Sequence, residues 1–220
     1  MNIQKNINIK ICGITTSKSI KIAANNNIKS LGFASDNLFG PNTCDDNSIR
    51  KLIKECKEYK IESVLLSQYK SCEELIKQID YTKPKTISCS YYFKKKDLRI
   101  LKNLFKRLRI GIAVNAKKFD LKYFEKISNL INVFYYDLNI YTKNQIHTFS
   151  IDDCKKQILL LKKFKKPIFI GGGINSENVS NIVNAVNPNG IDISRSLKDK
   201  KNNLCENRLN KLLKILPHAA

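Results

Sequence analysis

Two residues that can transfer protons stand at the ends of apolar runs, in segments far apart in the sequence. Cys12 follows the run Ile9–Ile11 and precedes a glycine, and Asp137 ends the run 132–136. A thiol has a pKa of about 8.5, which a neighbouring cation lowers, so Cys12 is a candidate general base near neutral pH. The Asp137 carboxylate is a second group suited to proton transfer. The alternatives are a buried structural cysteine for Cys12, and a solvated loop residue or a helix cap for Asp137.

Two segments have the residue types that bind phosphate: the glycine run 171–173, and residues 194–195 at the end of a later apolar run. Consecutive glycines let the backbone approach an oxyanion closely, and N–H groups at the start of the following helix point at it. Ser194 adds a hydroxyl and Arg195 adds a cation. The alternative is that the glycines only form a tight turn. No GxGxxG pattern of other nucleotide-binding folds is present. The predicted phosphate- or substrate-binding residues are Gly172, Gly173, Asp192, Ser194 and Arg195.

Short apolar runs alternate with amphipathic stretches along the whole chain, which predicts parallel strands joined by helices. Eight such units in 220 residues favour a closed (β/α)8 TIM barrel, an α/β fold, with residues 1–220 as a single domain. An open doubly wound sheet is the alternative, and fewer units would suit it better. Ser17 is the expected cap of the first helix, and Leu159, Leu160 and Leu161 are expected to be buried. The predicted strands are 9–13, 30–34, 62–66, 85–91, 109–114, 132–137, 167–171 and 190–194, and the predicted helices are 17–26, 47–59, 72–79, 97–108, 121–130, 151–164, 177–186 and 204–216.

In a TIM barrel the chemistry lies at the C-terminal ends of the strands, and phosphate binds at the loops after the seventh and eighth strands. The proton-transfer candidates and the predicted phosphate residues all fall at such strand ends. This agreement between residue type and position favours an enzyme acting on a phosphorylated small molecule.

Composition excludes several other classes of protein. The net charge of +21 comes mostly from Lys spread through every segment, so it favours compositional drift over a nucleic-acid interface, which uses clustered Arg. The chain has two His and seven Cys without a CxxC pair, so we expect no metal site and mostly buried, free thiols. It has no apolar run long enough to span a membrane and no secretory leader, so we expect a cytoplasmic protein.

Four segments resemble the phosphoribosylanthranilate isomerase family. Residues 10–15 are similar to its KICGIT opening, 172–179 to its GGL-x-x-x-NV segment, and 190–194 to the start of its GVDVSSGVE strand, while Tyr136-Asp137 stands where the family has an LLD aspartate. The resemblance implies an isomerase of tryptophan biosynthesis that needs no cofactor. It also implies that Cys12 is the general base and Asp137 the general acid.

Other segments depart from that family. The family's SPR turn, whose Arg meets the anthranilate side, corresponds to residues 39–43, which contain no Arg. The QLHG motif is replaced by residues 88–93, the GGTG loop by residues 144–147, and SSGVE by Ser194-Arg-Ser-Leu-Lys198. The chain is therefore either a drifted member of the family or an enzyme with a changed substrate. Arg195 or a nearby Lys is the candidate for the missing cation.

Two further classes of function stay open. Indole-glycerol-phosphate synthases and ribulose-phosphate epimerases are other phosphosugar barrels, but the characteristic opening of the former and the metal-binding His of the latter are missing. A non-catalytic barrel that binds RNA or a protein partner through its basic surface is the remaining alternative. We expect a monomer or a homodimer.

Overall fold

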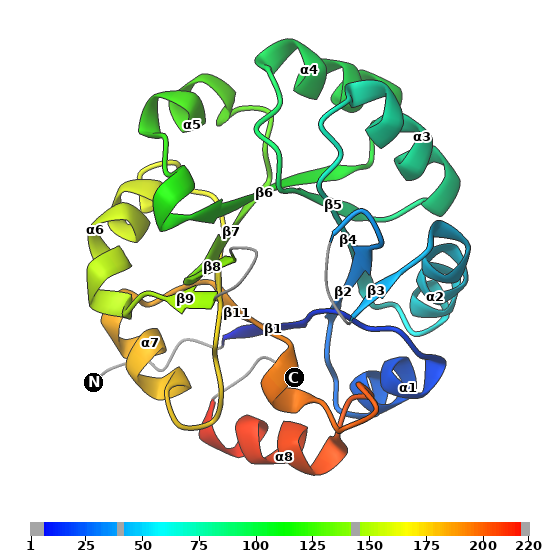
Figure 1. Cartoon of the computed structure of the whole chain (residues 1–220), viewed down its shortest axis with the longest axis vertical. Coiled ribbons are helices and arrows are strands. Elements are labelled where there is room, and N and C mark those ends of the chain that lie inside the picture. The colour runs from blue at the N-terminus through cyan, green and yellow to red at the C-terminus, as the bar shows by residue number, and fades with distance from the viewer. Residues whose placement is uncertain (1–6, 39–41, 142–145, 217–220) are drawn as a thin grey trace.

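Eight parallel strands close into a barrel in the computed structural model, which describes residues 7–38, 42–141 and 146–216 (Figure 1). Each strand pairs with its neighbours in chain order, and the first strand pairs with both the second and the last, which closes the ring. This confirms the predicted (β/α)8 fold. The strands of the barrel are β1 (Asn8–Ile11), β2 (Ser30–Ser35), β4 (Glu62–Ser67), β5 (Thr86–Cys89), β6 (Arg109–Asn115), β7 (Val133–Asp137), β10 (Ile168–Gly171) and β11 (Gly190–Ile193).

A helix follows each strand and lies on the outside of the ring (Figure 1). Among the described residues none of the helices is long and apolar enough to cross a membrane. The helices are α1 (Ser17–Asn25), α2 (Asp46–Glu58), α3 (Cys72–Thr82), α4 (Lys95–Leu104), α5 (Leu121–Ile127), α6 (Ile151–Lys162), α7 (Val179–Val186) and α8 (Glu206–Ile215).

Several short elements that the sequence did not predict lie after the C-terminal ends of the strands. A short strand lies beside β2, a two-stranded hairpin follows β7, and 3-10 turns follow β6 and β11. They lie in the connections that follow strands, where the barrel carries its site. These elements are β3 (Thr43–Cys44), β8 (Asn139–Tyr141), β9 (Ile146–Thr148), η1 (Ala116–Lys118) and η2 (Arg195–Leu197).

The main core fills the layer between the strands and the helices, because alternate strand residues point outward onto the apolar faces of the helices. Ile9 and Ile11 of β1 belong to this layer. A smaller apolar cluster contains Val64, Val133 and Tyr135, which lie on the opposite faces of their strands and fill part of the barrel interior. Inward-facing residues at the C-terminal strand ends are therefore presented above a packed interior.

Some helix details differ from the predictions. Thr16, rather than Ser17, caps α1, since its hydroxyl accepts a hydrogen bond from the Ser19 N–H at 3.3 Å. Helix α4 ends at Leu104, so the predicted extension to Leu108 is wrong, although Leu108 is buried in the following loop. In α6, Leu161 is buried but Leu159 is 48% exposed, because three consecutive residues cannot all lie on one face of a helix.

The cysteines are free, as predicted, but only some of them are buried. Cys56, Cys89 and Cys154 are buried, whereas the other four are partly exposed, so the prediction of mostly buried thiols holds for a minority. The partly exposed thiols include Cys12, at the C-terminal end of β1.

Candidate functional site

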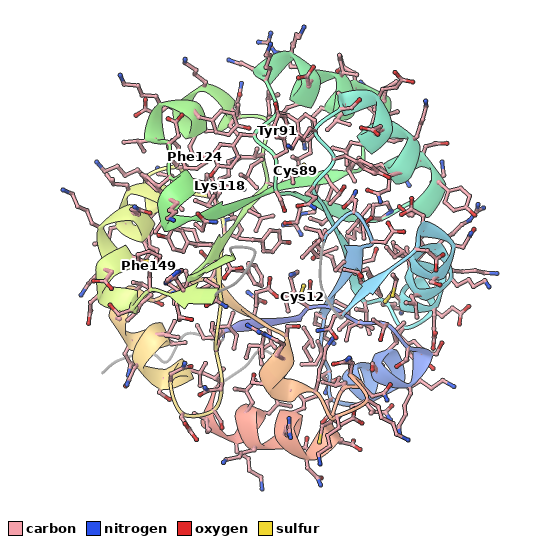
Figure 2. The ribbon with its side chains drawn as sticks, viewed as in Figure 1. Cys12, Cys89, Tyr91, Lys118, Phe124 and Phe149 are labelled. Carbon is pink, nitrogen blue, oxygen red and sulfur yellow. The ribbon has the colours of Figure 1, made fainter. Side chains whose placement is uncertain are left out.

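Cys12 lies directly after β1, inside the ring of strands (Figure 2). Its backbone N–H donates to the carbonyl of Ile193 at 2.8 Å, which continues the pairing of β1 with β11 to the end of the strand. Because side chains alternate along a strand, Cys12 shares the inward face with Lys10, while Ile11 points to the helices. On β2, Gly32 leaves room for the thiol, since a Cβ there would lie 2.8 Å from the Cys12 Sγ.

Below Cys12, Lys10 and Asp192 form a buried ion pair. The Lys10 Nζ lies 2.5 Å from one carboxylate oxygen of Asp192, and the Lys10 side chain is 1% exposed. The ammonium also lies 4.8 Å from the centre of the Tyr135 ring. Burial alone would lower the pKa of Lys10, but the adjacent Asp192 raises it above its ordinary value, so the ammonium stays charged. The second oxygen of Asp192 is buried and has no hydrogen-bond partner among the described residues.

Asp137 ends β7 and is paired in register with Gly171 at the end of β10. Burial raises the pKa of its carboxyl to about 6, although the Asn139 N–H, which donates to Oδ1 at 2.8 Å, works in the opposite direction. The charge of Asp192 also raises this pKa, and Lys10 lowers it. A carboxyl group that titrates near pH 6 retains a protonated fraction at neutral pH, as a general acid requires.

The glycine turn after β10 is built against Asp137. Gly172 and Gly173 have φ angles of +93° and +70°, in the left-handed region that favours glycine. A Cβ on Gly172 would collide with Oδ1 of Asp137 and lie 2.6 Å from the Leu138 nitrogen. Helix α7 begins at Val179, two residues after the predicted start at Glu177, so a loop separates the glycines from the helix.

Ser194 and Arg195 stand at the end of β11, next to the same turn. The Ser194 hydroxyl lies 3.3 Å from the position of a Cβ on Gly13, which places it beside the residue that follows Cys12. Arg195 is exposed at the start of η2, and its charge lowers the pKa of Asp137. The Ser196 hydroxyl donates to the Ile174 carbonyl at 2.7 Å and so ties η2 to the loop after β10. The predicted hydroxyl and cation therefore lie at the same end of the barrel as Cys12 and Asp137.

Lys198 is a charged residue at this end that the sequence did not assign to the site. It is 4% exposed, and its ammonium donates a hydrogen bond to the carbonyl of Gly13. Burial lowers its pKa to about 8, while the thiols of Cys12 and Cys44 oppose that shift. The signal in the sequence was the departure from SSGVE, which puts Lys at this position.

Of the segments that depart from the family motifs, two are only partly described. Residues 39–41 and 144–145 lie outside the described residues. Asn42 is described, and its side-chain oxygen is buried without a hydrogen-bond partner in the described parts of the chain. After β5, an aromatic group replaces the QLHG motif, with Tyr91 packed edge to face on Phe93 at 5.0 Å between ring centres.

The arrangement at this end of the barrel suits proton transfer beside an anion. It combines a thiol, a carboxyl group with a raised pKa, several cations and a turn of glycines in the left-handed region. No group of three or more His, Cys, Asp or Glu among residues 7–38, 42–141 and 146–216 is placed to hold a metal ion.

Comparison with known proteins finds N-(5'-phosphoribosyl)anthranilate isomerases among the relatives of this chain. No protein-family model matches the chain. The chain is 25% identical over 205 residues to N-(5'-phosphoribosyl)anthranilate isomerase 2 of Methanosarcina mazei, covering 87% of this chain and 85% of that protein. It is 24% identical over 195 residues to N-(5'-phosphoribosyl)anthranilate isomerase of Petrotoga mobilis, covering 87% and 88% of the two chains.

Solved structures with the same fold include isomerases of this kind. The N-(5'-phosphoribosyl)anthranilate isomerase of Pyrococcus furiosus superposes with a TM-score of 0.75 at 16% identity, over 95% of this chain and 98% of that one. A structure of monomers generated from the dimeric isomerase of Thermotoga maritima gives a TM-score of 0.70 at 19% identity, over 94% and 97% of the chains. These structures show the fold, and the curated relatives match nearly the whole chain. The chain is therefore similar over most of its length to N-(5'-phosphoribosyl)anthranilate isomerases.

Proposed function

We propose that this protein is a cytoplasmic enzyme of tryptophan biosynthesis that converts N-(5-phosphoribosyl)anthranilate to 1-(2-carboxyphenylamino)-1-deoxyribulose 5-phosphate. The observation that carries the proposal is that Cys12 and Asp137 stand at the C-terminal ends of β1 and β7, at the same end of the barrel, where the glycine turn after β10 packs against Asp137. The reaction is an Amadori rearrangement, an isomerisation in which no cofactor takes part. The protein acts as a monomer or a homodimer on a phosphorylated small molecule, with no role for nucleic acid or membrane.

Asp137 is the general acid of the first step. Its carboxyl proton passes to the ring oxygen of the ribose as the bond between that oxygen and C1 breaks. The lone pair of the anthranilate nitrogen forms the C=N bond of the open-chain Schiff base. The raised pKa of about 6 supplies the protonated carboxyl for this step near neutral pH.

Cys12 is the general base of the second step. Its thiolate removes the proton from C2, the electrons of that C–H bond form the C1=C2 bond, and the C=N electrons return to nitrogen. The resulting enolamine becomes the ketone when C1 takes up a proton and the C2 hydroxyl loses one. The numbers of atoms and electrons are unchanged, as an isomerisation requires.

The phosphate group is bound by Gly172, Gly173, Ser194 and Arg195, which offer backbone N–H groups, a hydroxyl and a cation. This anchor at one end of the substrate fixes the sugar carbons relative to the acid and the base. We assign Asp192 a different role from the one that its sequence position suggested. Its ion pair with Lys10 makes it a support beneath Cys12, and a carboxylate would repel a phosphate.

A changed substrate is the second candidate function. It is favoured by the stretch 39–43, which lacks the family's Arg, and by Lys198, which stands where the motif has Glu. The same base, acid and phosphate anchor would then serve a related phosphosugar that carries another group on C1.

The direct test is conversion of N-(5-phosphoribosyl)anthranilate by the purified protein, with the product followed by chromatography. We expect Cys12→Ala and Asp137→Asn each to lower kcat/KM by about 10²–10⁴-fold, because each removes one proton-transfer group. Cys205→Ser is the matched control, since Cys205 is also partly exposed but lies at the start of α8. The wild type, but not the Cys12 variant, should restore growth of a tryptophan auxotroph that lacks this step. An inactive but folded wild type would contradict the proposal.

A further inference from the structure

Lys198 is a buried cation for which the mechanism above has no use. Only 4% of the residue is exposed. Its side chain reaches over the end of β1, where the ammonium donates to the Gly13 carbonyl and lies 3.0 Å from the position of a Cβ on Gly13. The ammonium of Lys198 is thus fixed against the peptide that directly follows Cys12.

The described residues give this cation no carboxylate partner. None of the ion pairs in the described ranges includes Lys198. The titratable groups that favour its charged form are the thiols of Cys12, after β1, and Cys44, on β3. From α8, the Arg208 guanidinium donates to the backbone carbonyl of Lys198, which adds a further positive charge nearby. Among the described residues, the groups whose ionised forms favour this buried ammonium are therefore thiols.

Two cations, Lys10 and Lys198, favour the thiolate of Cys12, and only one of them has a carboxylate partner among the described residues. Lys10 and Asp192 act on the thiol in opposite directions, because they carry opposite charges and form one ion pair. Lys198 remains as the cation that no neighbouring carboxylate balances. Burial raises the pKa of the Cys12 thiol, and Lys198 opposes that rise together with Lys10.

We propose that Lys198 is a positioning residue for Cys12, whose buried ammonium stabilises the thiolate at the end of β1. The ammonium and the thiolate thereby form an ion pair that a water-accessible lysine could not hold as firmly. In the isomerase this would favour the ionised form of the general base, a consequence that rests on the proposed function. The ion pair itself does not depend on which substrate the protein uses.

Two departures from the family motifs fit this role. The stretch 39–43 has lost the motif's Arg, and residue 198 has gained a Lys in place of Glu. In the structure, Asn42 and Lys198 both lie against Gly13, at 2.9 Å and 3.0 Å from its Cβ position. The end of the barrel therefore has a cation on the η2 side, where the motif would have an anion.

The test is the pH dependence of alkylation of each cysteine by iodoacetamide, resolved by mass spectrometry of the peptides. Lys198→Gln keeps a hydrogen-bond donor for the Gly13 carbonyl but removes the charge, and Lys198→Arg keeps the charge. Lys200→Gln is the matched control, since Lys200 is exposed two residues further on. Cys72, at the start of α3, is the internal reference, because it is partly exposed and its pKa has no contribution from Lys198.

We expect the alkylation midpoint of Cys12 to rise by about one pH unit or more in Lys198→Gln, which is a tenfold slower reaction at a pH below both midpoints. Cys44 should move in the same direction, and Cys72 should not move. Lys198→Arg and Lys200→Gln should match the wild type. An unchanged Cys12 midpoint in folded Lys198→Gln, or an equal shift of Cys72, would overturn the proposal.

A reciprocal measurement serves if Lys198→Gln does not fold. Linkage requires that the loss of the thiolate change Lys198 as much as the loss of Lys198 changes the thiol. NMR titration of the Lys198 side chain should therefore give a lower pKa in Cys12→Ser than in the wild type, and an unchanged value would reject the ion pair. Neither measurement uses the substrate, so a wild type that lacks isomerase activity would refute the proposed function alone. If it is active, the acidic limb of kcat/KM should move to higher pH in Lys198→Gln with KM unchanged.

Discussion

The two ends of the barrel hold their charged side chains in different ways. At the N-terminal end, Glu62 accepts hydrogen bonds from Arg109 at 2.8 Å and from Thr86 at 2.5 Å, and both charged side chains remain partly exposed, at 21% and 38%. At the C-terminal end, burial shifts the pKa of Asp137 up to about 6 and that of Lys198 down to about 8. At the N-terminal end the charged side chains form an ion pair. At the C-terminal end burial brings the pKa values of two charged side chains close to neutral pH.

This difference separates structural charges from charges available for chemistry. A partly exposed pair such as Glu62 and Arg109 contributes little to stability, because water screens the attraction between its charges. Buried groups whose pKa values lie near neutrality gain and lose protons readily, which is what proton transfer needs. Lys10 and Asp192 lie between the two cases, since they are buried like the site and paired like the N-terminal end.

The largest expected effect on stability comes from breaking the buried pair. Lys10→Met leaves the Asp192 carboxylate buried without its counter-charge, and one of its oxygens already lacks a partner in the described residues. We expect the free energy of unfolding to fall by about 3–5 kcal/mol. Arg109→Met breaks the partly exposed pair and should lower it by less than about 1 kcal/mol. Denaturation in urea measures both, and equal losses would remove the distinction between the two ends.

The next effect concerns the turn that supports the acid. Gly172→Ala places a Cβ 2.6 Å from the backbone nitrogens of Leu138 and Asn139 and against the Asp137 carboxylate, at a φ of +93°. We expect a loss of at least about 2 kcal/mol in unfolding free energy. The matched control is Gly171→Ala, whose Cβ would lie 3.3 Å from the nearest atom, the Asp192 carbonyl oxygen. Thermal denaturation of the pair should show a clearly lower Tm for Gly172→Ala only, and equal Tm values would mean that the turn relaxes freely.

Much of the fold and part of the site could be predicted because local patterns determine them. Period-two and helical spacing identify the eight units, and in a barrel of parallel strands the C-terminal ends meet at one end. Cys12 and Asp137 each stand at such an end, so their shared location follows from the fold alone. The apolar core needed no knowledge of long-range contacts either, since each helix carries its own buried face.

The remaining features depend on contacts that no local pattern contains. The pairing of Lys10 with Asp192 joins residues 182 apart and exists only once β1 pairs with β11. The burial of Lys198 depends on η2 and on the bridge between Lys198 and Leu204, which follow a strand end where the sequence reads as polar loop. The hairpin of β8 and β9 is too short to give a periodic signal.

The smallest expected effect is a gain in stability. It tests whether the buried carboxyl group of Asp137 lowers the free energy of unfolding of the wild type. The pKa of Asp137 in the folded protein, about 6, is above the ordinary value of 3.8, so the folded state binds the proton more tightly than the unfolded state does. Its contribution to stability is therefore largest below pH 3.8 and declines as the pH rises to about 6, above which the folded state carries the cost of partly burying the ionised carboxylate.

Asp137→Asn removes this ionisation, and its amide oxygen still accepts the hydrogen bond from the Asn139 N–H. We expect the variant to be more stable than the wild type by about 1–2 kcal/mol above pH 6, a figure reduced from the full linkage value because solvent reaches the partly exposed side chain. The advantage should shrink as the pH falls toward 4, while kcat/KM stays low throughout. Unfolding free energies measured across this pH range decide the matter. Equal stability of the two proteins at every pH would mean that burial does not raise the pKa of Asp137. The contrast between the two ends of the barrel would then be lost for this residue.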